Sequence, residues 1–219
     1  MATPSSLVEL AQKPIHFGTD GWRGVIAADF TVARVLQVAP IAAQVLAEVY
    51  GDEASHRLVV VGYDRRFLSP EFAQAAATAI QTAGFDVVLA DQFAPTPAFS
   101  WAAKDLGALG AIVITASHNP AIYSGLKVKS ALGGSVPPDV THQIEARLDQ
   151  PIPVASEPGR LTLFNPWESY CAALQQRVDI DAIQQAIAAG KLTVFADVMH
   201  GAAAGGLAKL LDAPVHELN

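Results

Sequence analysis

The sequence predicts an α/β protein: a layered α/β/α domain with a mixed, largely parallel sheet, followed by the start of a second similar domain. Short β-branched runs alternate with helical patterns, which is typical of such a layered domain. The runs are apolar throughout, as in strands that are buried on both faces. The helical patterns begin and end at capping residues, prolines and glycines, which marks them as separate elements.

Three apolar runs predict strands, at residues 58–62, 85–90 and 111–115. A first helix is expected over 31–50, where apolar residues recur on one face and Pro40 predicts a kink or an internal break. A second helix is expected over 69–83, with Ser69 as its N-cap, and a glycine follows it as a stop signal. A third helix, over 97–106, ends in the same way.

A proline-rich stretch separates two parts of the chain. Residues 149–163 show no sustained hydrophobic period, which is typical of a domain linker. We expect a first domain over 1–150, a linker over 151–163 and an incomplete second domain over 164–219. In that last part the patterns predict helices from Asn165 to about Val178, over 181–189 and over 201–211, and a strand over 191–196. One strand cannot cover three helices, so the second domain is expected to be unfinished.

Composition and charge exclude several classes of protein. With 51% hydrophobic residues among 219, the chain can bury a core, which excludes an intrinsically disordered protein. The formal charge of −7 argues against nucleic acid as the main partner, but a few local cations suffice for a small phosphorylated ligand. The longest apolar stretches are too short to span a bilayer, and no signal peptide is recognisable. The single cysteine, Cys171, allows no internal disulfide. We therefore expect a soluble, cytoplasmic protein without a nucleic-acid or membrane partner.

The densest group of polar residues, 115–120, directly follows the strand expected at 111–115. Loops at the carboxyl ends of strands form the ligand crevice of open α/β sheets, so Ser117 is placed where a nucleophile is useful. A serine hydroxyl needs a neighbouring base or a prior covalent activation. His118 is expected to point the other way in an extended chain, and Asn119 is held extended by the proline after it. The alternative is a turn whose polar residues serve local hydrogen bonding.

Three further segments carry cations that could serve a phosphorylated ligand. The glycine-rich segment 17–24 lets the backbone approach a ligand, and Arg23 within it offers a rigid fork suited to phosphate; an ordinary turn is the alternative. Lys127 follows the serine loop and could reach the same crevice, although a solvated lysine is the commoner outcome. In the segment 62–66, an Asp–Arg pair that fixes a loop is favoured over direct catalysis. His200 is interpreted as structural.

In their order along the chain, these segments resemble the α-D-phosphohexomutases, the phosphoglucomutase/phosphomannomutase family. The matching segments are Gly-Thr-Asp-Gly-Trp-Arg-Gly at 18–24, Val-Gly-Tyr-Asp-Arg-Arg at 61–66, Thr-Ala-Ser-His-Asn-Pro at 115–120 and Gly-Leu-Lys at 125–127. The segment 197–201 is similar to the start of the family's second domain. The resemblance covers the chain from about Ile15 to Leu211.

The resemblance implies a mutase that interconverts hexose 1-phosphate and hexose 6-phosphate through a phosphoserine and a bisphosphate intermediate, with glucose and mannose favoured over glucosamine. It implies that Ser117 carries the phosphoryl group and that His118 contacts the transferring group or the sugar. Arg23 and Lys127 would stabilise charge and assist proton transfer. The substrate-binding residues that it implies are Thr19, Asp20, Gly21 and Asn119. The implied partners are the hexose phosphate substrate and the hexose bisphosphate intermediate.

The resemblance also implies Mg²⁺, held between the phosphate on Ser117 and three aspartates of the second domain. No Asp-Gly-Asp-x-Asp-Arg pattern occurs between residues 201 and 219, so only Ser117 of that ligand set is present. Ser124 stands where the family usually has asparagine. The family's two later domains, with their sugar-recognising and phosphate-clamping loops, have no counterpart here. We therefore expect the N-terminal portion of a mutase, truncated inside domain two and not active alone.

Two other functions stay open on the sequence. The chain could be a non-catalytic remnant that binds a sugar phosphate or another protein, with self-association through the incomplete second domain. It could also be a phosphatase or other hydrolase that uses Ser117 as a nucleophile, although no acidic residue that would orient the base and no metal cluster stand at a recognisable spacing.

Overall fold

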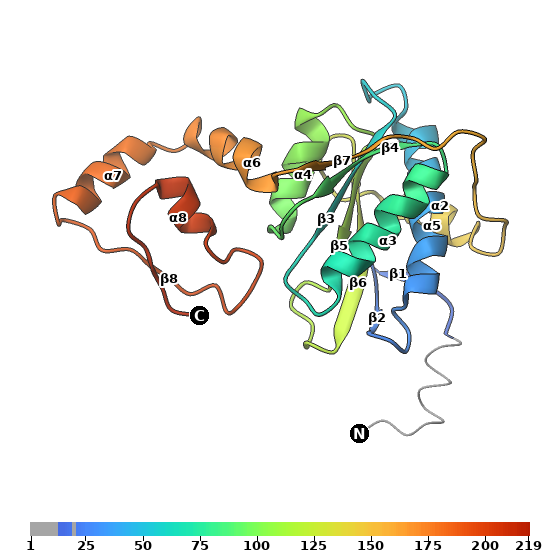
Figure 1. Cartoon of the computed structure of the whole chain (residues 1–219), viewed down its shortest axis with the longest axis horizontal. Helices are drawn as coiled ribbons and strands as arrows, with labels where there is room; N and C mark the ends of the chain where they lie inside the picture. Colours follow the sequence, from blue (N-terminus) through green and yellow to red (C-terminus); the bar gives the residue numbers. More distant parts are fainter. Residues whose placement is uncertain (1–12, 19–20) are drawn as a thin grey trace.

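A mixed β-sheet forms the centre of the larger part of the molecule (Figure 1). The computed structural model describes residues 13–18 and 21–219. Within them the sheet has seven strands in the order β1-β2-β6-β5-β3-β4-β7. The strands are β1 (Phe17–Gly18), β2 (Gly21–Val25), β3 (Leu58–Tyr63), β4 (Asp86–Ala90), β5 (Gly110–Ile114), β6 (Tyr123–Ser130) and β7 (Leu161–Phe164). Neighbours among β5, β3, β4 and β7 are parallel, whereas β1, β2 and β6 pair antiparallel, so the predicted mixed sheet is confirmed.

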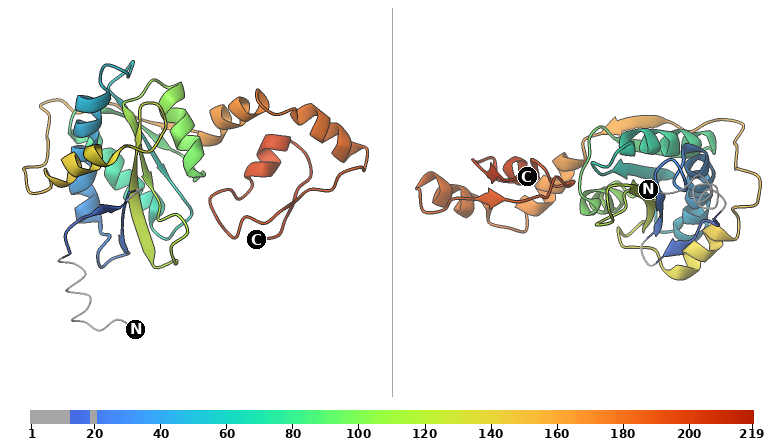
Figure 2. Two further views of the ribbon diagram at one scale, coloured as in Figure 1. Left: turned by 180° about the vertical axis from the view of Figure 1, so that it is seen from behind. Right: turned by 90° about the horizontal axis from the view of Figure 1, so that it is seen from below.

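Helices cover both faces of this sheet, as the layered fold requires (Figure 2). Two glycines show which helix lies on which face. A Cβ on Gly110 of β5 would meet Leu46 of α2 (Val32–Tyr50), and a Cβ on Gly62 of β3 would meet the ring of Phe99 in α4 (Thr96–Asp105). The register pairs Gly62 with Val113, so the two glycines face opposite sides. Helices α3 (Ser69–Thr82) and α5 (Pro138–Glu145) pack beside α2.

The long helix α2 is a core element. It is long and apolar enough to cross a membrane by length and composition, but about half of it is buried and it packs against α3, α5, β5 and β6. Pro40 lies inside this single helix, which corrects the alternative of an internal break. Thr31 accepts a hydrogen bond from the backbone N–H of Arg34 and caps the first turn.

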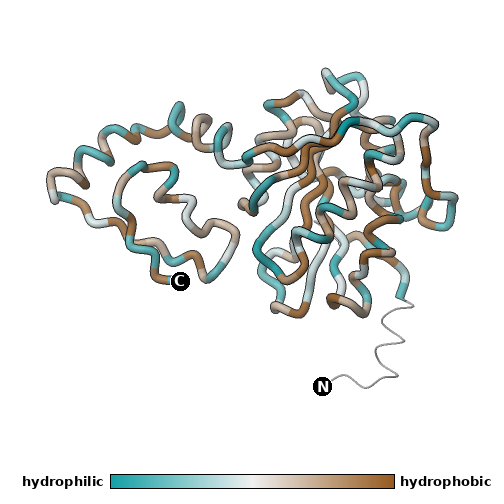
Figure 3. The backbone as a smooth tube through the Cα atoms, in the orientation of Figure 1, coloured by the Kyte–Doolittle hydropathy of each residue, from teal (hydrophilic) through white to brown (hydrophobic). Residues whose placement is uncertain are grey.

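The most hydrophobic segments of the chain run through the centre of the larger part (Figure 3).

The predicted boundaries at the start of α3 and at β7 are wrong. The N-cap of α3 is Leu68, at φ +60°, and Ser69 is the first residue of the helix; its hydroxyl donates to Asp64 Oδ1 instead (2.9 Å). The expected linker 151–163 is also too long, because its last three residues lie in β7, which pairs in parallel with β4. The backbone N–H of Arg160 donates to Asp86 Oδ1, which fixes the returning chain at the sheet edge. A short edge strand beside prolines carries too little pattern to be distinguished from a linker.

The remaining residues form α6 (Pro166–Gln175), α7 (Ile180–Ala188), β8 (Phe195–Ala196), α8 (Gly206–Leu211) and β9 (His216–Glu217). Asn165 caps α6 as expected, accepting from the backbone N–H of Trp167 (3.0 Å). The predicted strand 191–196 shrinks to β8, and the helix expected over 201–211 begins only at Gly206. Phe195 and Met199 are 62% and 81% exposed, so this part buries few large apolar side chains.

Candidate active site

The serine loop is a tight turn at the carboxyl end of β5. The backbone N–H of Asn119 donates to the carbonyl of Ala116 (3.1 Å), and the N–H of Ser117 donates to Thr115 Oγ1 (3.0 Å). Ser117 has φ +58°, in the left-handed region that non-glycine residues rarely adopt. The expectation of an extended chain is therefore wrong. His118 Nδ1 lies 3.5 Å from Ser117 Oγ, at an exposed position.

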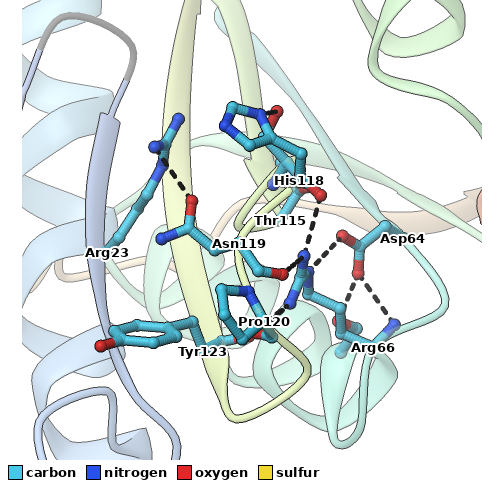
Figure 4. Close-up of polar contacts among 10 residues, drawn as sticks. Arg23, Asp64, Arg66, Thr115, His118, Asn119, Pro120 and Tyr123 are labelled. Carbon is cyan, nitrogen blue, oxygen red and sulfur yellow. Dashed lines mark hydrogen bonds and ion pairs between the residues drawn. The ribbon is translucent and has the colours of Figure 1, made fainter.

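Arg66, in the loop after β3, reaches across to the serine loop (Figure 4). Its Nη2 donates to the carbonyls of Ser117 (2.8 Å) and Asn119 (2.7 Å). Its Nη1 donates to the carbonyls of Pro120 and Tyr123 (2.9 Å each). Its Nε pairs with Asp64 Oδ2 at 3.3 Å. The predicted Asp–Arg pair thus exists, but the loop that it fixes is the serine loop.

A buried phenol lies at the carboxyl end of β3. Tyr63 is the last residue of β3 and directly precedes Asp64. Its side chain is buried, and burial raises the pKa of the phenol above its ordinary value, with a smaller contribution from the negative charge of Asp91.

Arg23 joins the loop from β2. Its Nη1 donates to Asn119 Oδ1 (3.1 Å), and its buried Nε has no hydrogen-bond partner among the residues that the structure describes. Gly125 of β6 lies directly opposite Arg23 in the sheet. A Cβ on this glycine would come within 2.6 Å of the carbonyls of Thr115 and Trp22. The missing side chain therefore lets β2, β6 and the start of the serine loop approach closely.

Lys127 lies on the same face of β6 as Gly125, two residues further along the strand. It is buried, with 7% of its surface exposed. Gly21 packs directly on it: at φ +114°, a Cβ there would lie 3.1 Å from Cα and Cγ of Lys127. The structure thus places Ser117 beside His118 and Arg23 beside Asn119, and Arg66 joins the two pairs through the carbonyls of Ser117 and Asn119. Thr19 and Asp20 lie outside the described residues.

The side chains that the structure describes do not fit a resident Mg²⁺. Among residues 13–18 and 21–219, no group of three or more His, Cys, Asp and Glu side chains could hold a metal ion. Asp64 is the carboxylate in contact with the loop-fixing arginine, and its oxygens already accept from Arg66 and from the Ser69 hydroxyl. Asp197, in the segment similar to a second-domain start, accepts from the N–H of Met199. No catalytic step is therefore assigned to a metal.

Comparison with known proteins decides the family. Residues 14–153 match the sequence model of the phosphoglucomutase/phosphomannomutase alpha/beta/alpha domain I, and this range contains the serine loop, Arg23 and Lys127. The chain belongs to the phosphoglucomutase/phosphomannomutase family. The curated relatives include a phosphoglucosamine mutase of Acidothermus cellulolyticus, 36% identical over 89% of this chain and 41% of its own length. They also include a phosphoglucomutase of Staphylococcus epidermidis, 36% identical over 62% of this chain and 25% of its own.

Solved structures of the family have the same fold. A Thermus thermophilus protein assigned as a phosphomannomutase has a TM-score of 0.80 and 36% identity, over 94% of this chain and 46% of its own. A Burkholderia thailandensis phosphoglucomutase/phosphomannomutase family protein, 24% identical with a TM-score of 0.67, supports the fold alone. The chain therefore spans less than half the length of these relatives.

The hydrogen bonds of Arg66 with the serine loop were not predicted from the sequence. The sequence indicates this residue as half of an ion pair, but its contacts with residues 117–123 depend on the neighbouring positions of β3 and β5 in the sheet. One signal could have pointed to it. Asp64 and Arg66 follow one parallel strand and Ser117 follows another, and the carboxyl ends of adjacent parallel strands meet at one edge.

Proposed function

We propose that this chain supplies the phosphoryl-carrying serine of a phosphohexomutase. The observation that carries the proposal is the turn at Ser117, which presents an exposed hydroxyl beside His118 Nδ1 at the carboxyl end of β5. The family match over residues 14–153 supports the same reading. Because the chain spans less than half of its relatives, the activity of the complete relatives is a proposal for it.

In the proposed reaction the enzyme starts with a phosphoryl group on Ser117 Oγ. The free hydroxyl of a hexose 1- or 6-phosphate attacks this phosphorus, so that the P–Oγ bond breaks as the bond from phosphorus to the sugar oxygen forms. The proton of the attacking hydroxyl passes through the polar side chains of the site to Ser117 Oγ, so the step neither gains nor loses a proton. The resulting bisphosphate turns over and returns its other phosphoryl group to Oγ by the reverse step, so nothing is consumed.

The cations of this chain suit that transfer. Phosphoryl transfer requires in-line positioning and positive charge against the three equatorial oxygens. Arg23 is held at the loop by Asn119, and its second terminal nitrogen and its Nε form a fork of the kind that binds phosphate. Lys127 lies on the same face of the sheet and adds a second positive charge. The phosphate on serine itself removes the need to activate a weak nucleophile.

The choice of hexose and the requirement for Mg²⁺ have less support than the phosphoryl-carrying serine. The named relatives act on glucosamine, glucose and mannose phosphates by their names, so the preference for glucose and mannose over glucosamine stays a prediction. The family resemblance implies Mg²⁺, whereas the described residues alone do not form its site. Carboxylate ligands would have to come from another segment. We also propose a cytoplasmic location, as expected for sugar-phosphate metabolism.

A chimera tests the function. Residues 14–164 of this chain, which include β7, would replace the matching part of the Staphylococcus epidermidis phosphoglucomutase, and isomer formation from glucose 1-phosphate would be measured beside the parent enzyme. We expect turnover that is abolished by Ser117→Ala. Release of inorganic phosphate without isomer would favour the hydrolase alternative. A folded chimera whose activity is unchanged by Ser117→Ala would overturn the assignment.

A further inference from the structure

We propose that Arg66 is a positioning residue that holds Ser117 in its left-handed backbone conformation and so presents Oγ to the substrate. This inference rests on the proposed function, because it names a residue that prepares the same serine. Arg66 binds backbone carbonyls of the serine loop, and not the hydroxyl of Ser117 or the ring of His118.

The N–H donors of the Arg66 guanidinium match the positions of the backbone carbonyls in the serine loop. Within the described part of the chain it contacts four backbone carbonyls between residues 117 and 123, all at 2.7–2.9 Å, and a carboxylate through Nε. Only arginine offers five N–H donors in a rigid planar fork; lysine has three donors around one nitrogen and cannot reach both edges of the loop. Hydrogen bonds from a charged donor are stronger than neutral ones, so the fork stabilises a specific loop shape.

The bond to the Ser117 carbonyl acts on the strained residue itself. The orientation of that carbonyl is set by ψ of Ser117, so the 2.8 Å contact with Arg66 Nη2 fixes the torsion that follows the positive φ. A left-handed non-glycine residue is unfavourable and persists only where its surroundings determine it. The contact with Asn119, two residues later, fixes the other end of the turn. Without these bonds Ser117 would relax to a negative φ, and Oγ would leave His118.

Asp64 holds the Arg66 side chain in its position against the serine loop. Its Oδ1 accepts from the Arg66 backbone N–H and from the Ser69 hydroxyl (2.9 Å each), while its Oδ2 pairs with Nε. The Arg66 and Asp64 side chains are each 13% exposed, so the positive charge is neutralised inside the protein. Arg66 therefore acts through the serine loop, whereas Arg23, which keeps a buried unpartnered Nε among the described residues, is the arginine suited to phosphate.

Amide hydrogen exchange of the full chain tests the inference without any activity. The reporters are the N–H groups of Ser117, Asn119 and Tyr123, each of which donates a hydrogen bond inside the loop. Arg66→Ala and Arg66→Lys are both expected to raise exchange there by roughly tenfold or more, since charge-assisted bonds to the loop are lost. Exchange in β3 and β5 should stay unchanged. The matched control is Arg65→Ala, whose guanidinium stacks over Phe93 and should leave the loop protected.

A double variant distinguishes positioning of Ser117 from a general contribution of Arg66 to the stability of the fold. Glycine adopts a positive φ without strain, so Ser117→Gly in the Arg66→Ala background should restore most of the lost protection. The inference is overturned if Arg66→Lys protects the loop like the wild type, if Ser117→Gly restores nothing, or if exchange rises equally across the whole sheet.

The chimera described above provides the catalytic readout. Because Arg66 does not touch the substrate, Arg66→Lys should lower kcat by roughly tenfold or more and change KM by less than about twofold. A raised KM with unchanged kcat would contradict a positioning role. If the chimera itself has no mutase activity, the proposed function fails, whereas the exchange experiment still decides whether Arg66 holds the turn.

Discussion

The guanidinium of Arg23 donates to the side-chain oxygen of Asn119 across 3.1 Å, and the two residues are 96 positions apart in the chain. The bond ties β2, near the start of the described chain, to the serine loop after β5. It also orients one edge of the arginine, whose buried Nε has no hydrogen-bond partner among the described residues. The glycine-rich segment and the serine loop are thus in direct contact.

Asn119→Ala should weaken phosphoryl transfer by roughly tenfold, because Arg23 loses the partner that orients it. The measurement is kcat/KM of the chimera for glucose 1-phosphate. Thermal unfolding should change little, since the bond lies at a loop and not in the core. Asn119→Ala with wild-type kcat/KM would show that Arg23 needs no orientation by the loop.

Gly125→Ala should destabilise the fold strongly. Its Cβ would lie within 2.6 Å of the Thr115 and Trp22 carbonyls, and backbone atoms cannot move aside as a flexible side chain can. We expect a loss of about 1–3 kcal/mol in the free energy of unfolding, as for other overpacked sites. Gly134→Ala is the matched control: its Cβ would lie 3.8 Å from Ser130 Oγ, in ordinary contact, and should cost less than about 0.5 kcal/mol. Urea unfolding of both variants tests this, and equal midpoints would contradict it.

The Glu48–Arg147 ion pair predicts one component of the acid sensitivity. Arg147 donates to both carboxylate oxygens of Glu48 (2.9 and 2.7 Å), and this bonding lowers the pKa of Glu48 below its ordinary value of 4.5. A carboxyl whose pKa is lower in the folded state stabilises the fold above its ordinary pKa and stops doing so as pH falls through the lowered value. The Glu48 side chain is 45% exposed, so the contribution is small, about 0.2–1 kcal/mol.

Comparing Glu48→Gln with the wild type by urea unfolding checks that sign. The variant should be less stable at neutral pH, and the difference should vanish in acid. Glu157→Gln serves as the control, because Glu157 is exposed and forms no ion pair among the described residues. A Glu48→Gln deficit that grows as the pH falls would contradict the assignment.

Limited proteolysis should divide the chain. Few large apolar side chains are buried after Phe164, with Trp167, Ile180 and Leu211 as the main ones among the described residues, while Phe195 and Met199 are exposed. A segment with so small a core opens locally at low cost in free energy. Cleavage is therefore expected first beyond residue 176, and later within 15–148. Resistance of both regions to the same degree would contradict this account.

Local signals predicted much of the fold. The alternation of strands and helices, the cap at Asn165 and the buried runs of β3 and β5 all follow from neighbouring residues in the chain. The edge strand β7 could not be predicted, because only its pairing with β4 distinguishes it from a linker. The serine motif was recognisable, but the positive φ of Ser117 was not.

That φ, and with it the position of His118, depends on long-range contacts. Arg66 contacts the loop from 51 to 57 positions away, and the close approach of the strands at Gly125 depends on two sheet neighbours. Sequence pattern reports local preference and burial, whereas these contacts appear only when the strand order is known. The substrate-binding role expected for Thr19 and Asp20 stays a prediction.

The proposed reaction depends most on Ser117 as the carrier of the phosphoryl group. The direct measurement is to incubate the chimera with a labelled hexose 1,6-bisphosphate, locate the phosphoryl group by peptide mass spectrometry, and then add unlabelled hexose monophosphate. We predict one phosphoryl group on Ser117, absent in Ser117→Ala, that passes to the added sugar. A phosphoryl group on another residue, or one on Ser117 that leaves only as inorganic phosphate, would contradict the account.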